Sequence, residues 1–245
     1  MEYSAPPVEL PRKPWIDRIQ AVAEILLLSG LVSGFCATLP LPLFHIGGMD
    51  FLLKDSKILS LYLLLESGIT FFILAAVLKL HRETLDRLGL RWESWKRHTA
   101  IGLALVPLLF LINAMVEFFF KVYLPRFYTE QNPLIQNVQT RQQLALFVFS
   151  AIVAGGIKEE LQRAFILNRF RTHLGGAGAG LVIWSLAFGA GHYVQGVPGV
   201  VIAALYGFVF GTIYLLSGSL VAPMVAHGAY DSLAILAYWF FSRAN

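Results

Sequence analysis

The sequence predicts an all-α protein, a polytopic bundle of about seven transmembrane helices with one short interfacial helix. Of the 245 residues, 57% are hydrophobic and only 14% are charged, whereas a soluble domain has about 25% charged residues. The charges also lie in short clusters between apolar stretches that are long enough to cross roughly 30 Å of hydrocarbon. Because a backbone in lipid must satisfy its own hydrogen bonds, stretches of this kind are expected to be helices.

The apolar stretches divide the chain into its expected elements. Residues 1–20 are Pro-rich and polar and are expected to form a flexible tail, because they lack the apolar core and cleavage site of a signal peptide. The predicted spans are residues 21–39, 58–80, 100–122, 144–171, 177–194, 200–216 and 221–241. Leu and Trp residues in the polar segment 81–98 predict the interfacial helix. Gly155-Gly156 predicts a kink or a break in the long fourth span.

The basic residues predict the orientation of the chain. Seven spans place the two termini on opposite sides, and a cytoplasmic N-terminus puts the basic segments 12–18, 79–97 and 169–171 inside. We therefore expect a multi-pass integral protein of the plasma (inner) membrane, with the lipid bilayer as a partner. The net charge of +4 does not indicate a nucleic acid partner, because the basic residues flank the spans. The single cysteine excludes an internal disulfide and a Cys-based metal site.

The fourth predicted span carries an unusual concentration of charge. Lys158, Glu159, Glu160 and Arg163 lie in an otherwise apolar segment. A charge at the bilayer centre costs roughly 2.5–3.5 kcal/mol on insertion scales. On a helix both glutamates share a face with Arg163. One interpretation is a salt bridge that only holds helices together. The other is a catalytic carboxylate beside a structural Glu–Arg pair, and the high free energy of placing four charges in the membrane favours it.

Two further polar sites lie in the apolar C-terminal half. His192 ends the fifth predicted span, and His227 and Asp231 lie four residues apart on one face of the seventh. If the fourth and fifth spans form an antiparallel hairpin, Glu159 and His192 both lie about 22–27 Å from its turn. His227 comes soon after the preceding turn, so it can reach the depth of Glu159 and His192 only if that turn enters the membrane. Irregular backbone at that depth must be covered by other parts of the protein. We expect Glu159, His192 and His227 to converge around one water-accessible cavity.

These residues resemble the three motifs of the CPBP family of intramembrane proteases, which includes the CAAX prenyl proteases of the Ras-converting type and the bacterial Abi proteins. The family motifs are Glu-Glu-xxx-Arg, Phe-xxx-His and His-xxx-Asn or Asp. The corresponding residues here are Glu159-Glu160 with Arg163, Phe188 with His192, and His227 with Asp231. The resemblance covers about residues 144–237. It implies that residues 144–245 are a CPBP-like catalytic core and that residues 21–143 are further transmembrane helices of one packed domain.

The spacing of the first motif departs from the family pattern. The family has three residues between Glu-Glu and Arg, and here only two intervene. Aligning the arginines places Lys158 at the first glutamate position, and a lysine cannot replace a carboxylate base. The sequence therefore favours aligning the glutamates, with Glu159 as the acting residue, and leaves open that Glu160 acts instead. In either case Arg163 is expected to be the structural ion-pair partner.

The resemblance implies a CAAX-type intramembrane endopeptidase that cleaves a membrane-associated peptide or protein, prenylated or not. Glu159, helped by His192, would take a proton from water. His227 would donate to the oxyanion of the tetrahedral intermediate. Asp231 must either be protonated and donate to the same oxyanion, or orient His227 and hold it charged. The donor role is favoured because it needs no change of chemistry from the Asn found in many family members.

Zinc chemistry is an alternative for the same residues. Glu159, His192, His227 and Asp231 are chemically suitable Zn²⁺ ligands, with a metal-bound water as the nucleophile. The spacing of these residues does not require a metal, so an enzyme without a cofactor is the favoured expectation.

Two non-catalytic alternatives also stay open. A membrane scaffold or immunity protein would use these polar residues only to hold helices together. A proton-coupled carrier would use Glu66, Glu117 and Glu159 as a relay. For Glu66, Glu117 and Asn113 the sequence favours interhelical hydrogen bonding over such a relay.

Overall fold

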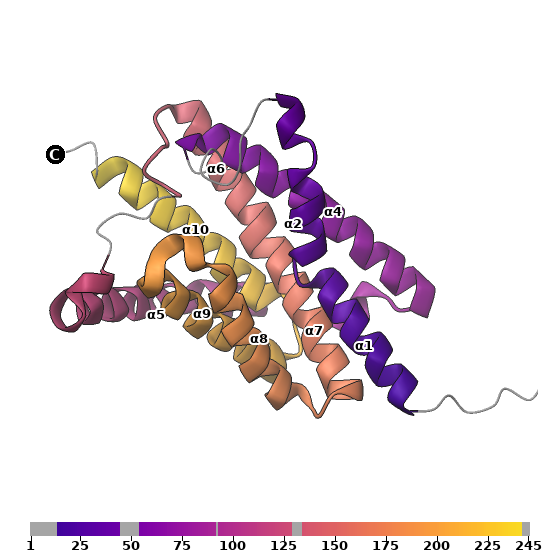
Figure 1. Cartoon of the computed structure of the whole chain (residues 1–245). Coiled ribbons are helices and arrows are strands. Elements are labelled where there is room, and N and C mark those ends of the chain that lie inside the picture. The colour runs from indigo at the N-terminus through magenta and orange to yellow at the C-terminus, as the bar shows by residue number, and fades with distance from the viewer. Residues whose placement is uncertain (1–13, 45–53, 92, 129–133, 242–245) are drawn as a thin grey trace, which may run out of the picture.

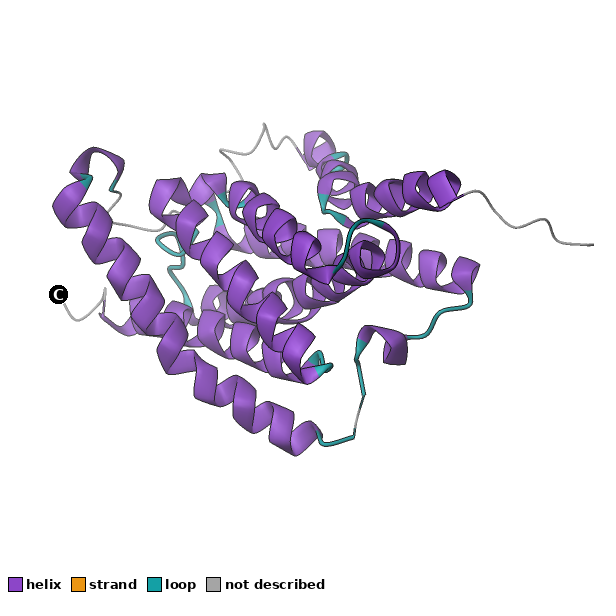
Figure 2. Ribbon diagram, turned by 90° about the horizontal axis from the view of Figure 1, so that it is seen from below, coloured by secondary structure: helices purple, strands orange, loops and turns teal. Residues whose placement is uncertain are grey.

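The computed structural model describes residues 14–44, 54–91, 93–128 and 134–241, and its regular elements there are all helical (Figures 1 and 2). The N-terminal α-helices are α1 (Pro14–Leu28), α2 (Leu31–Thr38), α4 (Ser56–His81) and α5 (Trp95–Tyr123). The C-terminal elements are α6 (Arg141–Ala151), η4 (Ile152–Glu159), α7 (Glu160–His173), α8 (Ala177–Gly191), α9 (Gly196–Ser217) and α10 (Val221–Phe241). Short 3₁₀ turns are η1 (Leu41–Phe44), η2 (Leu85–Leu88), η3 (Pro125–Phe127) and η5 (Tyr193–Gln195). The predicted all-α class is confirmed.

Four helical segments in the described part of the chain are long and apolar enough to cross a membrane: Pro14–Leu43, Ser56–His81, Trp95–Tyr123 and Tyr193–Ser217. The prediction of an integral membrane protein therefore holds. The predicted number of seven spans is not reproduced by length and composition alone. The helix formed by α6, η4 and α7 carries the charged residues, α8 has only 15 residues, and α10 contains His227 and Asp231.

The first predicted span differs from the structure at its start and in its middle. Helix α1 begins at Pro14, inside the region that was expected to be a flexible tail. The helix is then interrupted at Gly30, whose φ of +91° is a left-handed conformation that favours glycine. The sequence therefore predicts one helix over residues 21–39 where the chain forms the two helices α1 and α2.

The fourth predicted span is continuous and does not break at Gly155-Gly156, but the irregularity expected there is present as a change of helix type. Residues Ile152–Glu159 instead form a π-helix between α6 and α7. A Cβ atom on Gly156 would lie 3.0 Å from the Cα atom of Gly228, so the backbones of η4 and α10 are in close contact. Small residues permit this packing of membrane helices. The glycines therefore serve a helix contact, and the altered winding of η4 is a feature often found at functional sites.

The predicted interfacial helix takes the form of a single 3₁₀ turn. Between α4 and α5 the described residues 82–91 and 93–94 contain η2, and its Leu88 is fully buried in the hydrophobic core whereas Leu85 is 41% exposed. Trp92 lies outside the described residues. The carbonyl of Gly89 accepts a hydrogen bond of 2.9 Å from the backbone N–H of Leu220, in the turn between α9 and α10. The segment thus covers that turn. The sequence predicts that the turn before His227 needs such a cover of protein.

The continuous helix formed by α6, η4 and α7 runs through the middle of the bundle (Figure 1). Helices α1, α2 and α4 lie on one side of it, and α8, α9 and α10 lie on the other. One hydrophobic core joins buried residues of α7, such as Phe165 and Ile166, to α1, α4 and α8. Helix α10 packs against both η4 and α5. Lys158 of η4 and Glu160, Arg163 and Arg169 of α7 are therefore buried inside the bundle.

Candidate active site

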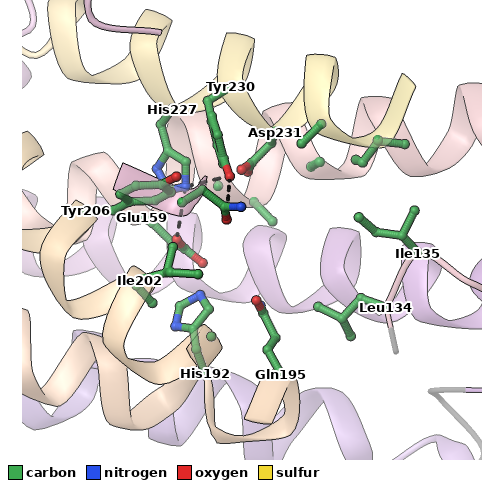
Figure 3. A pocket seen from close by; sticks show the side chains of 18 of the residues that line it. Leu134, Ile135, Glu159, His192, Gln195, Ile202, Tyr206, His227, Tyr230 and Asp231 are labelled. Atoms are coloured by element: carbon green, nitrogen blue, oxygen red, sulfur yellow. Dashed lines mark hydrogen bonds and ion pairs between the residues drawn. The ribbon is translucent and has the colours of Figure 1, made fainter. Parts of the chain in front are cut away.

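Four of the predicted site residues line one cavity of about 410 Å³. Glu159 comes from η4, His192 follows the last residue of α8, and His227 and Asp231 come from α10. Figure 3 shows His192 on the opposite side of Glu159 from His227. Further polar residues of the cavity wall are Asn113, Glu117, Tyr128, Gln195, Tyr206 and Tyr230. The expected convergence of Glu159 and the two histidines therefore occurs.

Carboxylates face both ring nitrogens of His227, and the one at Nδ1 forms a hydrogen bond. Its Nδ1 atom lies 2.8 Å from Oε1 of Glu160. Its Nε2 atom lies 3.8 Å from Oε2 of Glu159 and 3.5 Å from Oδ2 of Asp231. The ring also stacks on Phe210, with 4.7 Å between the ring centroids. An ionised Glu160 can only accept a hydrogen bond, so Nδ1 carries a hydrogen and Nε2 is the atom that faces the cavity carboxylates.

The two neighbouring glutamates have different surroundings. Glu160 is fully buried and does not line the cavity, and its Oε1 atom accepts hydrogen bonds from Nη1 of Arg163 and Nδ1 of His227. Glu159 faces the cavity. The guanidinium of Arg163 lies over the rings of Phe188 and Phe210, 4.7 and 5.5 Å from their centroids, an arrangement that stabilises a cation. The predicted Glu–Arg pair is thus formed by Glu160.

His192 has one ring nitrogen fixed by the backbone. Its Nδ1 atom lies 2.7 Å from the carbonyl oxygen of Phe188, one helical turn earlier in α8. Because a carbonyl oxygen only accepts, Nδ1 carries the hydrogen and Nε2 of the neutral ring has a free lone pair. The phenylalanine of the second motif therefore orients His192 with its backbone and packs against Arg163 with its ring.

Gly155 is a site residue that the sequence did not identify as one. A Cβ atom at this position would lie 2.5 Å from Oδ2 of Asp231 and 3.2 Å from Nε2 of His227. The absence of a side chain lets both groups lie against the backbone of η4. The glycine pair was visible in the sequence, but its spacing from the third motif gave no sign of this contact.

The predicted hydrogen bonding between helices is confirmed for two of the three membrane polar residues. Glu66 accepts a hydrogen bond of 2.7 Å from Ser33 of α2, and Asn113 accepts one of 3.1 Å from the hydroxyl of Tyr230. Glu117 forms no such bond within the described residues and lines the cavity instead. Glu66 does not line that cavity. The relay expected of a proton carrier is therefore not assembled in one cavity in this part of the chain.

The cavity residues do not form a metal site as they are arranged. Among the described residues, no three His, Cys, Asp or Glu side chains are placed so that they could hold one ion. The side chains thus do not fit the tetrahedral ligand set that zinc prefers.

The fold and this site define a class: a helical membrane protein in which carboxylates and histidines from separate helices meet in a buried cavity. Residues 140–233 match a protein-family model described as Rce1-like, type II CAAX prenyl endopeptidase Rce1-like. These residues therefore form an Rce1-like domain, and the resemblance to the CPBP and CAAX proteases is confirmed. The matched segment contains every predicted site residue. Neither the curated proteins nor the solved structures give a significant match.

Replacing Arg163 by alanine is expected to lower the yield of folded protein. The side chain is almost fully buried, and its loss leaves the carboxylate of Glu160 buried without its cation. Breaking one partner of a buried ion pair costs about 3–5 kcal/mol. The measurement is the fraction of monodisperse protein after detergent extraction, together with thermal unfolding. A variant that folds normally but is inactive would instead place Arg163 in the chemical step.

Proposed function

We propose that this protein is an intramembrane endopeptidase of the CAAX type that activates water with a glutamate and a histidine. The observation that carries this proposal is the single cavity in which Glu159, His192, His227 and Asp231 meet inside an Rce1-like domain. The general class, a membrane protein with a peptidase-family domain, rests on the family match. The choice of Glu159 over Glu160 rests on its exposure to the cavity.

The geometry supports a division of roles among the cavity residues. A water between Glu159 and Nε2 of His192 would attack the scissile carbonyl as Glu159 takes its proton. In the doubly protonated form of His227, Nδ1 donates to Glu160 and Nε2 would donate to the oxyanion. Asp231 would give a second hydrogen bond to the same oxygen. Collapse of the intermediate breaks the C–N bond, and the proton on Glu159 passes to the leaving amine.

The substrate we propose is a membrane-associated peptide or protein, with or without a prenyl group. Apolar side chains occupy one part of the cavity wall: Leu63, Leu134, Ile135, Phe147 and Ile235. Figure 3 shows Leu134 and Ile135 on the side of the cavity away from the two histidines. An apolar wall beside the reactive groups suits a substrate that arrives from the lipid phase. We further propose the plasma (inner) membrane and a cytoplasmic N-terminus, from the distribution of basic residues.

The test is incubation of the purified full-length protein with quenched CAAX peptides, one prenylated and one not. Each reaction is run with and without a chelator, and the products are identified by mass. We expect cleavage within the CAAX sequence that is insensitive to the chelator and absent from the Glu159→Gln protein. Cleavage of neither peptide would contradict the CAAX-type activity. Loss of cleavage with the chelator, restored by Zn²⁺, would replace the proposed chemistry by metal chemistry.

The Asp231→Asn protein is expected to keep most of its activity and to extend that activity toward alkaline pH. A protonated aspartate donates a hydrogen bond only until it ionises, whereas an asparagine amide donates at every pH. The measurement is a pH–rate profile of both proteins, with and without chelator. If Asp231 instead holds His227 charged across the 3.5 Å between them, the alkaline limit will move downward, and the donor role is then rejected.

A further inference from the structure

A buried ion pair lies directly behind the carboxylate that we assign as the base. Nζ of Lys158, in η4, lies 2.6 Å from Oε2 of Glu66, in α4. The same Nζ atom lies 3.8 Å from Oε1 of Glu159. The side chains of Lys158 and Glu66 are only 8% and 7% exposed. Neither residue lines the cavity, so Lys158 touches Glu159 from the side that a substrate does not reach.

Glu66 is fixed by further contacts within the N-terminal helices. Its Oε1 atom accepts hydrogen bonds from the hydroxyls of Ser33 in α2, at 2.7 Å, and Thr70 in α4, at 3.2 Å. Both oxygens of Glu66 are therefore occupied, one by hydroxyls and one by the ammonium of Lys158. These helices precede residue 140, where the match to the Rce1-like family begins. A part of the chain outside the matched domain thus contacts the charged residues of the site.

The position of Lys158 between two carboxylates has an electrostatic consequence for Glu159. Burial disfavours the charged form of a carboxylate, and an opposite charge about 4 Å away favours it. Lys158 supplies such a charge, and the anchor on Glu66 keeps the ammonium from moving into a contact that would occupy Glu159 completely. Oε2 of Glu159, which lies 3.8 Å from Nε2 of His227, is left for the cavity.

We propose that Lys158, anchored by Glu66, is a positioning residue that keeps Glu159 ionised and directed into the cavity. Helices α2 and α4 are then part of the active site, although they lie outside the matched domain. This inference rests on the proposed function. It adds a residue that acts through the base and touches no substrate.

Other charged and titratable groups also act on Glu159. They are Arg163 of α7, His192 just after α8, and His227 and Asp231 of α10, whereas Tyr62 and Glu66 of α4 act on Lys158. Lys158 is separable from these groups because it and Glu66 can be removed together without leaving an unpaired buried charge. Replacement of a buried ion pair by apolar residues is often tolerated.

The first test is the Lys158→Met/Glu66→Met protein, compared with wild type by a pH–rate profile of kcat/KM. We expect a folded protein whose acid limb moves to higher pH by about 0.5–1 unit, because the stabilising cation is gone. The matched control is Ser67→Ala, next to Glu66 on α4, whose hydroxyl donates a hydrogen bond to the carbonyl of Leu63 in its own helix. A double variant with the wild-type profile would overturn the inference and leave a purely structural ion pair.

The single variant Glu66→Gln gives a result of opposite sign. Without its anchor, Lys158 has Glu159 as its nearest anion, so the ionised carboxylate is stabilised further and is a weaker base. We expect the acid limb to move to lower pH and kcat on the plateau to fall, with KM nearly unchanged. A shift in the same direction as the double variant would contradict the anchoring role. If the double variant does not fold, the direction in which the acid limb of Glu66→Gln moves decides whether Glu66 anchors Lys158.

Infrared spectroscopy separates this inference from the proposed function. The carboxylic-acid band that is present in the wild type and absent from Glu159→Gln reports the protonation of Glu159 without any substrate. We expect this band to appear at higher pH in the Lys158→Met/Glu66→Met protein than in the wild type. If the wild-type protein cleaves no peptide, the proposed function is contradicted, but the role of Lys158 can still be tested by the infrared band. An unchanged titration of the band would overturn the role of Lys158 whatever the activity.

Discussion

The Glu159→Gln protein is expected to fold normally and to lose at least about 10²-fold in kcat/KM for peptide cleavage. A positioned general base contributes about 10²–10⁴-fold to a rate, and glutamine keeps the shape of the side chain while removing the proton acceptor. The carboxylate of Glu159 is 3.8 Å from both Lys158 and His227. These distances are longer than hydrogen bonds, so the substitution breaks no short contact that holds helices together.

The matched control is the same substitution at the neighbouring residue, Glu160→Gln. Glu160 accepts hydrogen bonds from Arg163 and His227 and is fully buried. Its substitution is therefore expected to reduce the yield of folded protein and the thermal stability, which Glu159→Gln leaves unchanged. Both proteins are compared by size-exclusion profile, thermal unfolding and cleavage of the same peptide. If Glu160→Gln is folded and inactive while Glu159→Gln is active, the roles of the two glutamates are exchanged.

Composition and motif order were sufficient to predict the helical membrane fold and the ionisable members of the candidate site. Long apolar stretches have few alternatives in lipid, so α4, α5, α9 and α10 begin and end close to the predicted limits. Charged residues in such stretches are costly unless they meet partners. This cost is why Glu159, His192 and His227 could be expected in one cavity before any geometry was known.

The features that the sequence did not predict depend on contacts between distant segments. The residues of the π-helix η4 would also suit a kinked α-helix, so the sequence does not distinguish the two forms. The close contact of η4 with α10 involves residues far away in the sequence. The pair of Lys158 with Glu66 joins residues 92 positions apart. Residues such as Leu85 and Leu88 suit a membrane interface or a buried turn equally well. Local pattern gives no means to choose between such alternatives.

The Gly155→Ala protein is expected to fold and to lose about 10²-fold in activity. The added Cβ atom would lie 2.5 Å from Oδ2 of Asp231 and 3.2 Å from Nε2 of His227. Both atoms are at the ends of side chains, so these groups can move aside at a small cost in stability. Their displacement disturbs the two groups assigned to the oxyanion, and a misplacement of about 1 Å can reduce a rate about 10²-fold.

Two further glycine variants show whether the loss at Gly155 comes from the site or from the fold. In Gly156→Ala the new Cβ atom would meet backbone atoms of Gly228 at 3.0 and 3.2 Å, which cannot move aside without shifting α10. We expect this protein to lose about 1–3 kcal/mol of stability, as overpacked helices do. Gly68→Ala, in α4, meets no atom within 4 Å and should change neither property. Thermal unfolding and peptide cleavage are measured for all three proteins. Full activity of Gly155→Ala would show that Asp231 and His227 do not act from the positions beside η4.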